Sequence, residues 1–320
     1  MSILVSGSLV YDNIMNFPDS FRNHILPEQV HILNVCFMVD RVERSWGGTA
    51  GNIAYSMRLL GGAPIVVSAV GTDGGDYLDH LRGNGINIDN VVKSDKQLTA
   101  GAYITTDADD NQITAFYNGP LDLSLQTNVN DLENITLALI SPTHKEVMKR
   151  HLKDCHEAGI KTVLDLGQQL TAFNQTELRQ MIEQSDFIIG NDYEMKLLQQ
   201  KSEMSASEIA DGKRILITTL GEKGSVITTA EGEMVEVGAC APKSLDDPTG
   251  AGDAFRAGFF VGYELGYSLK TCGQMGSVAA SYAIESYGTQ AHKFSAEEFC
   301  QRYESVFKEK VNLTSAEMLM

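Results

Sequence analysis

Residues 247–255 read Asp-Pro-Thr-Gly-Ala-Gly-Asp-Ala-Phe and stand directly before an apolar segment with helical spacing. Gly250 and Gly252 lack a Cβ atom, so their backbone can adopt positive φ and approach a ligand closely. The N–H groups of Gly250, Ala251 and Gly252, continued by those of the first helical turn, would form a cradle for an anion. The helix dipole would add about half a positive charge there. The string therefore predicts an anion-binding loop at the start of a helix.

Asp253 lies in the first turn of this predicted helix, beside the cradle. The dipole and the neighbouring N–H groups should keep its carboxylate ionised, so that it can accept a proton from an attacking hydroxyl. A base and an anion cradle side by side are what phosphoryl transfer to an alcohol requires. An ordinary turn with a capping acid is the alternative, and it would be favoured for an isolated Gly-x-Gly-Asp. The length of the string favours the catalytic interpretation.

Outward from this loop, short apolar runs alternate with helical patterns over most of the chain, and the pattern becomes helical after Asp253. Such alternation is typical of an α/β fold, in which a doubly wound, mainly parallel sheet is buried between helices. One domain is expected over residues 1–320. The expected strands are 3–9, 64–70, 137–141, 162–166, 187–190 and 215–219, and the expected helices are 50–60, 145–158, 175–182, 194–201, 254–265, 271–284 and 296–308.

Two segments in the first third of the chain break this rhythm. Residues 30–46 alternate like an exposed β-ribbon, and residues 99–117 are typical of a hairpin with an acidic turn at 107–111. We interpret both as a small β-lid over the mouth of the main sheet, formed by about residues 13–46 and 97–118. The open edges of such a ribbon predict a homodimer formed through the lid.

The composition limits the classes of partner. The chain of 320 residues carries 25 basic and 42 acidic side chains, for a net charge of −17. Such a surface repels phosphate backbones, so neither nucleic acid nor an anionic membrane is an expected partner. A nucleotide would need glycine-rich backbone and a metal ion. Five scattered cysteines without a Cys-x-x-Cys pair, and no leader-like or membrane-spanning apolar run, predict a cytoplasmic protein.

Two strings in the first sixty residues suit a polyhydroxyl substrate. Gly47 and Gly48 would let the backbone reach its hydroxyls, and Asn52 offers a donor and an acceptor. Ser8 and Asp12 follow the first predicted strand, at the end where α/β proteins bind ligands. A carboxylate there can accept hydrogen bonds from two vicinal hydroxyls of a sugar. A common loop and a surface or capping acid are the alternatives.

Two further strings follow later strands. Asn191 and Glu194 suit a hard cation that keeps its waters and takes one or two protein oxygens, although Asn191 could instead cap a helix. Thr219, Gly221 and Gly224 form a Thr-x-Gly-x-x-Gly string that is neither a Walker A loop nor a Rossmann fingerprint. A hairpin turn is the alternative for this second string.

Together, and in this order, these strings resemble the signatures of the ribokinase-like (PfkB) family of carbohydrate and nucleoside kinases. The resemblance implies ATP and Mg²⁺ as cofactors and a K⁺ ion near the glycine-rich loop. It implies Asp253 as the base; Gly250, Ala251 and Gly252 as the anion hole; Ser8, Asp12, Gly47, Gly48 and Asn52 at the sugar; Asn191 and Glu194 at the phosphates and, through water, at Mg²⁺; and Thr219, Gly221 and Gly224 at the nucleotide.

Within this family the chain is most similar to the bacterial adenosine kinases, in the strings at 7–12, 17–18, 26–28, 256–259 and 288–290. The similarity implies transfer of the ATP γ-phosphate to the 5′-hydroxyl of adenosine, giving AMP and ADP in purine salvage. A sugar kinase, such as a ribokinase or fructokinase, is the alternative, and the intact Asp253 disfavours a catalytically silent nucleoside-binding protein.

A purine needs an apolar or aromatic wall and an amide or two at its edge. Phe116 in the lid hairpin is the candidate for stacking on the base, and Gln168 and Gln169 are the candidates for its nitrogens. Ala102 stands where adenosine-specific relatives place a second aromatic side chain. Selectivity for adenosine is the property that this departure affects.

Overall fold

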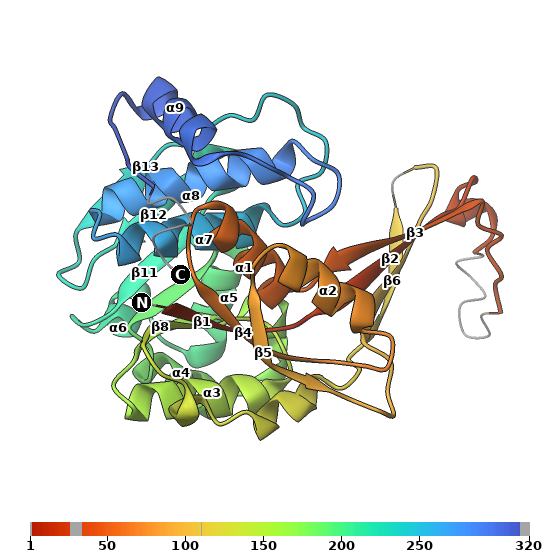
Figure 1. The fold of residues 1–320 in the computed structure, drawn as a ribbon, viewed down its shortest axis with the longest axis horizontal. Helices are drawn as coiled ribbons and strands as arrows, with labels where there is room; N and C mark the ends of the chain where they lie inside the picture. The colour runs from red at the N-terminus through yellow and green to blue at the C-terminus, as the bar shows by residue number, and fades with distance from the viewer. Residues whose placement is uncertain (1, 26–33, 110, 314–320) are drawn as a thin grey trace.

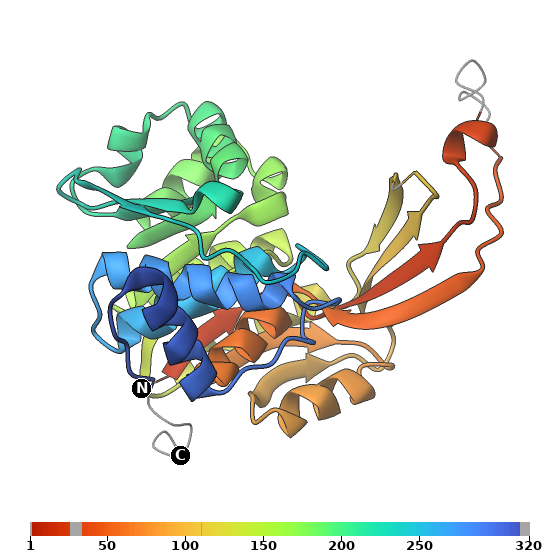
Figure 2. The same cartoon turned by 90° about the horizontal axis from the view of Figure 1, so that it is seen from above.

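The computed structural model of the chain describes residues 2–25, 34–109 and 111–313. Within them, a nine-stranded sheet lies between helices, and a second, four-stranded sheet projects from this body (Figures 1 and 2). The strands of the large sheet are β1 (Ser2–Ser6), β4 (Pro64–Val70), β5 (Asn87–Lys93), β8 (Ile135–Ile140), β9 (Lys161–Asp165), β10 (Phe187–Asn191), β11 (Ile215–Thr219), β12 (Ser225–Thr228) and β13 (Met234–Val237).

The large sheet is mainly parallel, which confirms the prediction from the sequence. Its order is β13-β12-β11-β10-β9-β8-β1-β4-β5, and the pairs from β11 to β5 are parallel, whereas β12 and β13 pair antiparallel at one edge. Ile3 and Val5 pack into one apolar cluster and Leu4 into another, because successive side chains of a strand point to opposite faces. Burial on both faces explains the continuous apolar runs.

Helices cover the two faces of this sheet. The apolar cluster on one face contains residues of α1 (Thr49–Leu59), α2 (Gly75–Gly83), α7 (Ala251–Glu264), α8 (Leu269–Ile284) and α9 (Ala296–Phe307), and the cluster on the other contains residues of α3 (Lys145–Glu157), α4 (Gln175–Glu183), α5 (Asp192–Ser202) and α6 (Ala206–Ala210). In the described part of the chain, every helix is too short or too polar to cross a membrane.

The strand order reverses beside β1. The chain runs from β1 to β4 and β5 on one side, then returns through β8 to β9, β10 and β11 on the other. The carboxyl ends of β1 and β8 therefore form a switch point, where open α/β sheets bind ligands. There the N–H of Ser8 donates to the carbonyl of Pro142 over 3.2 Å, across the two strand ends. The fold thus places a site immediately after β1.

The four-stranded sheet consists of β2 (Val10–Asn16), β3 (Arg41–Gly47), β6 (Ala100–Thr106) and β7 (Gln112–Tyr117), in the order β3-β2-β6-β7. We call it the lid sheet, and Figure 2 shows it extending away from the helices. Antiparallel pairing of β6 with β7 confirms the predicted hairpin. At its turn, Asp107 Oδ1 accepts the N–H groups of Asp109 and Asn111 over 3.0 and 2.8 Å. That this sheet closes over the site stays a prediction.

Two expectations for the first third of the chain were wrong. The strand expected over 3–9 is divided, because the chain leaves the large sheet after Ser6 and enters the lid sheet at Val10. Asp12 therefore lies inside a lid strand and not at the end of β1. Within the described part of the ribbon expected over 30–46, which is residues 34–46, the strand begins at Arg41; residues 30–33, like the string at 26–28, lie outside the described residues.

Candidate active site

The glycine-rich loop leads into α7, as the sequence predicts. Gly250 is the N-cap of this helix, with φ of +81°, a conformation that glycine adopts without steric cost. A Cβ atom there would also lie 3.1 Å from the side chain of Thr289. The N–H groups of the first turn follow at Ala251, Gly252 and Asp253, and Gly252 is exposed. The local geometry is that of an anion cradle at a helix N-terminus.

Asp253 lies half-buried in this first turn, and Asn52 Nδ2 donates a hydrogen bond to its Oδ2 over 2.8 Å. Burial raises the pKa of Asp253 to about 6, and the charge of Arg256 and the bond from Asn52 only partly offset it. From the sequence we expected the helix N-terminus to keep the pKa of this carboxyl low. In the structure, burial has the larger effect and raises the pKa. The carboxylate is still ionised at neutral pH, and its pKa lies closer to that pH than the pKa of an ordinary aspartate, as suits a general base.

Asn52 is oriented by groups from the other end of the chain. Its Oδ1 accepts hydrogen bonds from Thr289 Oγ1 and Gln290 Nε2 over 2.8 and 3.0 Å, and Gln290 Nε2 also donates to the Tyr77 hydroxyl over 2.7 Å. Two donors at the amide oxygen leave the amide nitrogen as the group that faces Asp253. Asn52 is therefore a hydrogen-bond partner of Asp253, and its predicted contact with substrate hydroxyls stays a prediction.

Asp12 reaches the same region from β2. Burial, with the negative charges of Asp247 and Asp253, raises the pKa of Asp12 to about 6. Gly47, in the neighbouring strand β3, makes room for this carboxylate, since a Cβ atom at Gly47 would lie 2.1 Å from Asp12 Oδ2. The structure thus brings Asp12 and Gly47 together within electrostatic reach of Asp253.

Gly48 and Ser8 form the crossing between the two sheets. Gly48 has φ of +86°, and a Cβ atom there would lie 2.5 Å from the carbonyl oxygen of Ser8. Ser8 is buried, and its hydroxyl accepts the N–H of Thr49 over 3.3 Å at the start of α1. Both residues have a structural function at this crossing, and their contact with substrate stays a prediction.

The residues expected at the nucleotide lie along the carboxyl edge of β10 and β11. Asn191 and Glu194 form a capping box at the start of α5, with two bonds of 2.8 Å, so the helix-cap alternative is confirmed for Asn191. Thr219 pairs with Asn191 across the two strands. The segment from Gly221 to Gly224 is the turn between β11 and β12, so the hairpin alternative is confirmed as well.

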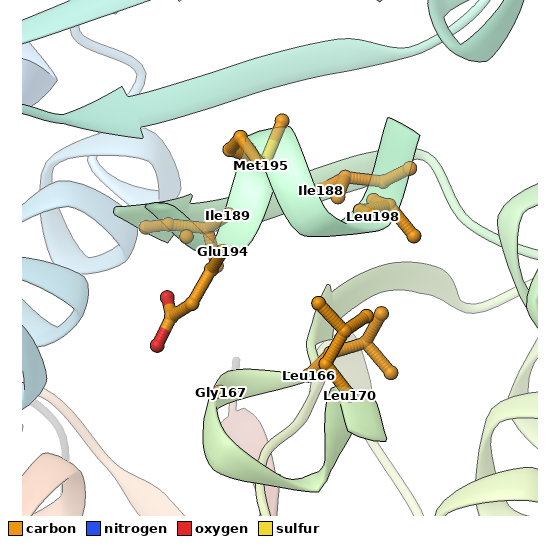
Figure 3. Close-up of a pocket in the computed structure, with 9 residues that line it drawn as sticks. Leu166, Gly167, Leu170, Ile188, Ile189, Glu194, Met195 and Leu198 are labelled. Atoms are coloured by element: carbon orange, nitrogen blue, oxygen red, sulfur yellow. The ribbon is translucent and has the colours of Figure 1, made fainter. Parts of the chain in front are cut away.

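Glu194 is also the candidate for Mg²⁺. Figure 3 shows its carboxylate turned away from the apolar side chains of Ile188 and Leu198, which line the pocket beside it. Its charge raises the pKa of Asp253, so Glu194 lies within electrostatic reach of that carboxyl. The described residues contain no group of three or more acidic, histidine or cysteine side chains that could hold a metal. A single carboxylate suits Mg²⁺ that keeps several waters and binds substrate phosphates.

The residues expected at a purine lie on two different elements. Gln168 is exposed and Gln169 is half-buried. Both lie in the 3₁₀ helix Gly167–Ala172, which follows β9. Phe116 is 53% exposed on β7 and pairs with the buried Ala102 of β6, which in turn pairs with Asp12 of β2. Phe116, Ala102 and Asp12 thus share one face of the lid sheet, and a ligand contact of the two glutamines stays a prediction.

Comparison with known proteins places this geometry in a family. A family model described as pfkB family carbohydrate kinase matches residues 14–295. The chain belongs to the pfkB carbohydrate kinase family. A nucleoside kinase of Methanocaldococcus jannaschii is 30% identical over 85% of this chain and 89% of its own length.

Solved structures agree with this assignment. A Burkholderia thailandensis nucleoside kinase in complex with inosine has a TM-score of 0.88 and 35% identity, covering 97% of this chain and all of its own (100%). The same kinase in complex with ADP-inosine has a TM-score of 0.85 and 37% identity, covering 98% of each chain. The ribokinase-like fold predicted from the sequence is confirmed.

From the sequence we did not predict several side chains that hydrogen-bond around Asn52 and Arg256. Thr289 and Gln290 were noticed only as part of a family string, and Tyr77 and Asp165 not at all. Each is hydrogen-bonded to a partner more than 90 residues away in the chain: Thr289 and Gln290 to Asn52, Tyr77 to Gln290, and Asp165 to Arg256. No local pattern marks such pairs, so only the fold could reveal them.

Proposed function

We propose that this chain is a nucleoside kinase that transfers the γ-phosphoryl group of ATP to the 5′-hydroxyl of a purine nucleoside. Adenosine is the foremost substrate, AMP and ADP are the products, and the role is cytoplasmic purine salvage. All five cysteines are free thiols, which suits a reducing compartment. The observation that carries the nucleoside proposal is the row of Asp12, Ala102 and Phe116 across the lid sheet.

The distance from Asp12 to Phe116 along this row matches the length of a nucleoside. Neighbouring strands lie about 4.8 Å apart, so Phe116 stands two strand spacings, roughly 10 Å, from Asp12 on the same face. The small side chain of Ala102 lies between them. A ribose whose hydroxyls bind Asp12 would extend its base over Ala102 and against the ring of Phe116. A free pentose or hexose would end before that ring, so the row favours a nucleoside over a sugar.

The residues around Asp253 suit the reaction. The 5′-oxygen attacks the γ-phosphorus, its proton passes to Asp253, and the bond from the γ-phosphorus to the bridging oxygen of ADP breaks. The N–H groups of the α7 N-terminus face the charge that develops on the phosphoryl oxygens. Mg²⁺, held by Glu194 through water, would neutralise phosphate charge when bound. Asp12 would hold the ribose, and the hydrogen bond from Asn52 would keep the carboxylate of Asp253 in position.

We expect kcat/KM to fall as the pH is lowered through about 6, because Asp253 and Asp12 both have pKa values raised to about 6 by burial. A protonated Asp253 cannot accept a proton, and a protonated Asp12 loses its charged hydrogen bonds. The two carboxyls interact, so the fall should be steeper than for one proton. Initial rates measured across this range, with circular dichroism as a control for folding, test it. A profile that stays flat through pH 6 would contradict it.

A substrate panel under one set of conditions tests the proposed function. Adenosine, inosine, guanosine, cytidine, ribose and fructose are compared with ATP and Mg²⁺, and in K⁺ against Na⁺ buffer. Inosine belongs in the panel because a relative has been solved with it. We expect purine nucleosides to give the highest kcat/KM. Ready phosphorylation of ribose or fructose, with none of any nucleoside, would establish the sugar-kinase alternative.

Phe116→Ala should raise the KM for adenosine by about tenfold or more, since an aromatic stack on a base contributes about 1–3 kcal/mol. Any activity on ribose should be unchanged. Leu125→Ala is the control, because Leu125 is also a large apolar side chain, is 44% exposed and lies in the 3₁₀ helix Leu121–Gln126, outside the lid sheet. Steady-state kinetics of the two variants decide the matter, and equal KM values would remove Phe116 from the site.

We also propose a homodimer formed through the lid sheet. Strand β7 lies at the edge of this sheet, and all six of its residues are exposed. Its outer face carries Ile113 and Tyr117, beside the exposed Tyr103 of β6. An uncovered apolar edge strand pairs readily with another strand. Light scattering should give the mass of a dimer at assay concentration, and a monomer would contradict this.

A further inference from the structure

A buried ion pair lies behind the anion cradle. Arg256 stands one helical turn after Asp253, and its side chain is 9% exposed, while that of its partner Asp165 is 1% exposed. Arg256 Nη2 donates to Asp165 Oδ1 over 2.7 Å. Nε lies 2.7 Å from Oδ2, although its N–H is not directed at that oxygen. Asp165 is the last residue of β9, so the pair fixes the start of α7 against the carboxyl edge of the large sheet.

The remaining nitrogen of this guanidinium, Nη1, faces the cradle. Side chains of a helix lean toward its N-terminus, so Arg256 covers the residue four positions earlier, which is Gly252. A Cβ atom on Gly252 would lie 2.8 Å from Nη1. Among the residues that the structure describes, Asp165 is the sole hydrogen-bond acceptor of the guanidinium. Nη1 therefore presents N–H groups beside the exposed backbone that would hold a phosphoryl group.

Several charged groups surround the Arg256 guanidinium, so it contributes to the electrostatics of this region as well as to packing. Arg256 lowers the pKa of Asp253, whereas Asp165 and Glu194 raise it, so all four charges act on one small region. Taking an arginine and a carboxylate out of water costs several kcal/mol, and a close pair offsets this cost best when every N–H has an acceptor. Here neither Nε nor Nη1 donates to an acceptor among the described residues, and Nη1 is the one that lies beside Gly252. A guanidinium that is already held in place stabilises negative charge that develops beside it, because it need not reorient during the reaction.

We propose that Arg256 is a further catalytic residue, whose Nη1 donates to an oxygen of the phosphoryl group during its transfer, and that Asp165 is the residue that positions it. The inference rests on the proposed phosphoryl transfer. The bond from the acceptor oxygen to phosphorus forms, the bond to the bridging oxygen of ADP breaks, and the proton goes to Asp253. Arg256 keeps its protons throughout and acts only on the charge of the oxygens.

The test compares variants that keep the fold. Arg256→Lys retains a cation but loses the fork, and Arg256→Gln combined with Asp165→Asn removes both buried charges together, so that neither is left unpaired. We expect both to lower kcat by about 10²-fold or more, as removal of one preorganised donor does. KM for the nucleoside and the dissociation constant for ADP should change less than about threefold. The affinity for ADP with aluminium fluoride, a mimic of the transferring phosphoryl group, should fall in parallel with kcat.

Arg214→Gln is the matched control. The Arg214 side chain is 8% exposed and its Nε donates to a backbone carbonyl, but it stands just before β11, at the amino edge of the sheet. This variant should lose thermal stability and keep kcat. The inference is overturned if both Arg256 variants keep kcat within about fivefold, or if they lose affinity for ADP and for ADP with aluminium fluoride equally. If the unaltered protein phosphorylates no nucleoside or sugar, the proposed function fails instead.

Discussion

Asp253→Asn should lower kcat by at least about 10²-fold while the nucleoside and ADP still bind. The asparagine has the shape of the aspartate and can accept the same hydrogen bond from Asn52, which spans 2.8 Å. It cannot accept the proton of the attacking hydroxyl, and general-base catalysis contributes about 10²–10⁴-fold. The backbone N–H groups and the bound substrates remain in place, so a residual rate is expected. Single-turnover kinetics, with affinities from calorimetry, separate the chemical step from binding.

Stability provides an independent check on this variant. Burial raises the pKa of Asp253 from 3.8 to about 6, so the ionised carboxylate opposes folding above that pH. Replacing it by a neutral amide should leave the free energy of unfolding at neutral pH equal or higher. Asp186→Asn is a matched control: Asp186 is half-buried at the opposite edge of the sheet, where it accepts the Thr162 N–H over 2.8 Å. A turnover close to that of the control would remove Asp253 from the mechanism.

The buried parallel core was the part of the fold best predicted from the sequence. Strands β4 and β11 have the predicted bounds, because each is a continuous apolar or β-branched run with sharp ends. Strand β5 and helix α2 were missed. The sequence of β5, Asn-Ile-Asp-Asn-Val-Val-Lys, is that of an edge strand with polar side chains, and its burial is correspondingly partial. Elements at the edge of a sheet bury little apolar surface, so the spacing of apolar residues in their sequence gives only a weak signal of a strand or helix.

The first strand shows a different limit. Residues 3–9 are apolar except for two serines and Gly7, and nothing in them marks where the chain leaves one sheet for another. The structure shows that Gly7 is at this crossing, because a Cβ atom there would lie 2.8 Å from Thr49 Oγ1. The constraint comes from α1, which starts some forty residues later in the chain. Apolar pattern alone therefore predicted a strand but not its division.

The same limit applies to the site. The motif around Asp253 predicted the loop and the helix start correctly, since these depend on neighbours in the chain, and that Asp253 is the base stays a prediction. The direction of the pKa shift was not predicted, because burial by distant segments decides it. The glycine-rich string at Gly47 was assigned to backbone contacts with substrate. The structure offers a second reason for a glycine there, which is the space taken by the Asp12 carboxylate.

Gly47→Ala should therefore lower kcat/KM for the nucleoside by about 10²-fold or more. The new Cβ atom would lie 2.1 Å from Asp12 Oδ2, so the carboxylate has to turn away from the ribose. Hydrogen bonds to a charged group contribute about 1.5–3 kcal/mol each, and two would be lost. Asp12→Ala should have an effect of similar size. Gly83→Ala is the control, since a Cβ atom at Gly83 meets no atom within 4 Å.

The double variant of Gly47 and Asp12 distinguishes the two reasons for the glycine. If Gly47 serves only to make room for the carboxylate, Gly47→Ala should have little effect in a protein that already carries Asp12→Ala, because two changes to one interaction are not additive. If the Gly47 backbone also contacts the substrate, the double variant should lose clearly more kcat/KM than Asp12→Ala alone. Steady-state kinetics of the four proteins give the coupling directly. We expect strong non-additivity, because the three atoms nearest to a Cβ atom at Gly47 all belong to the Asp12 carboxylate.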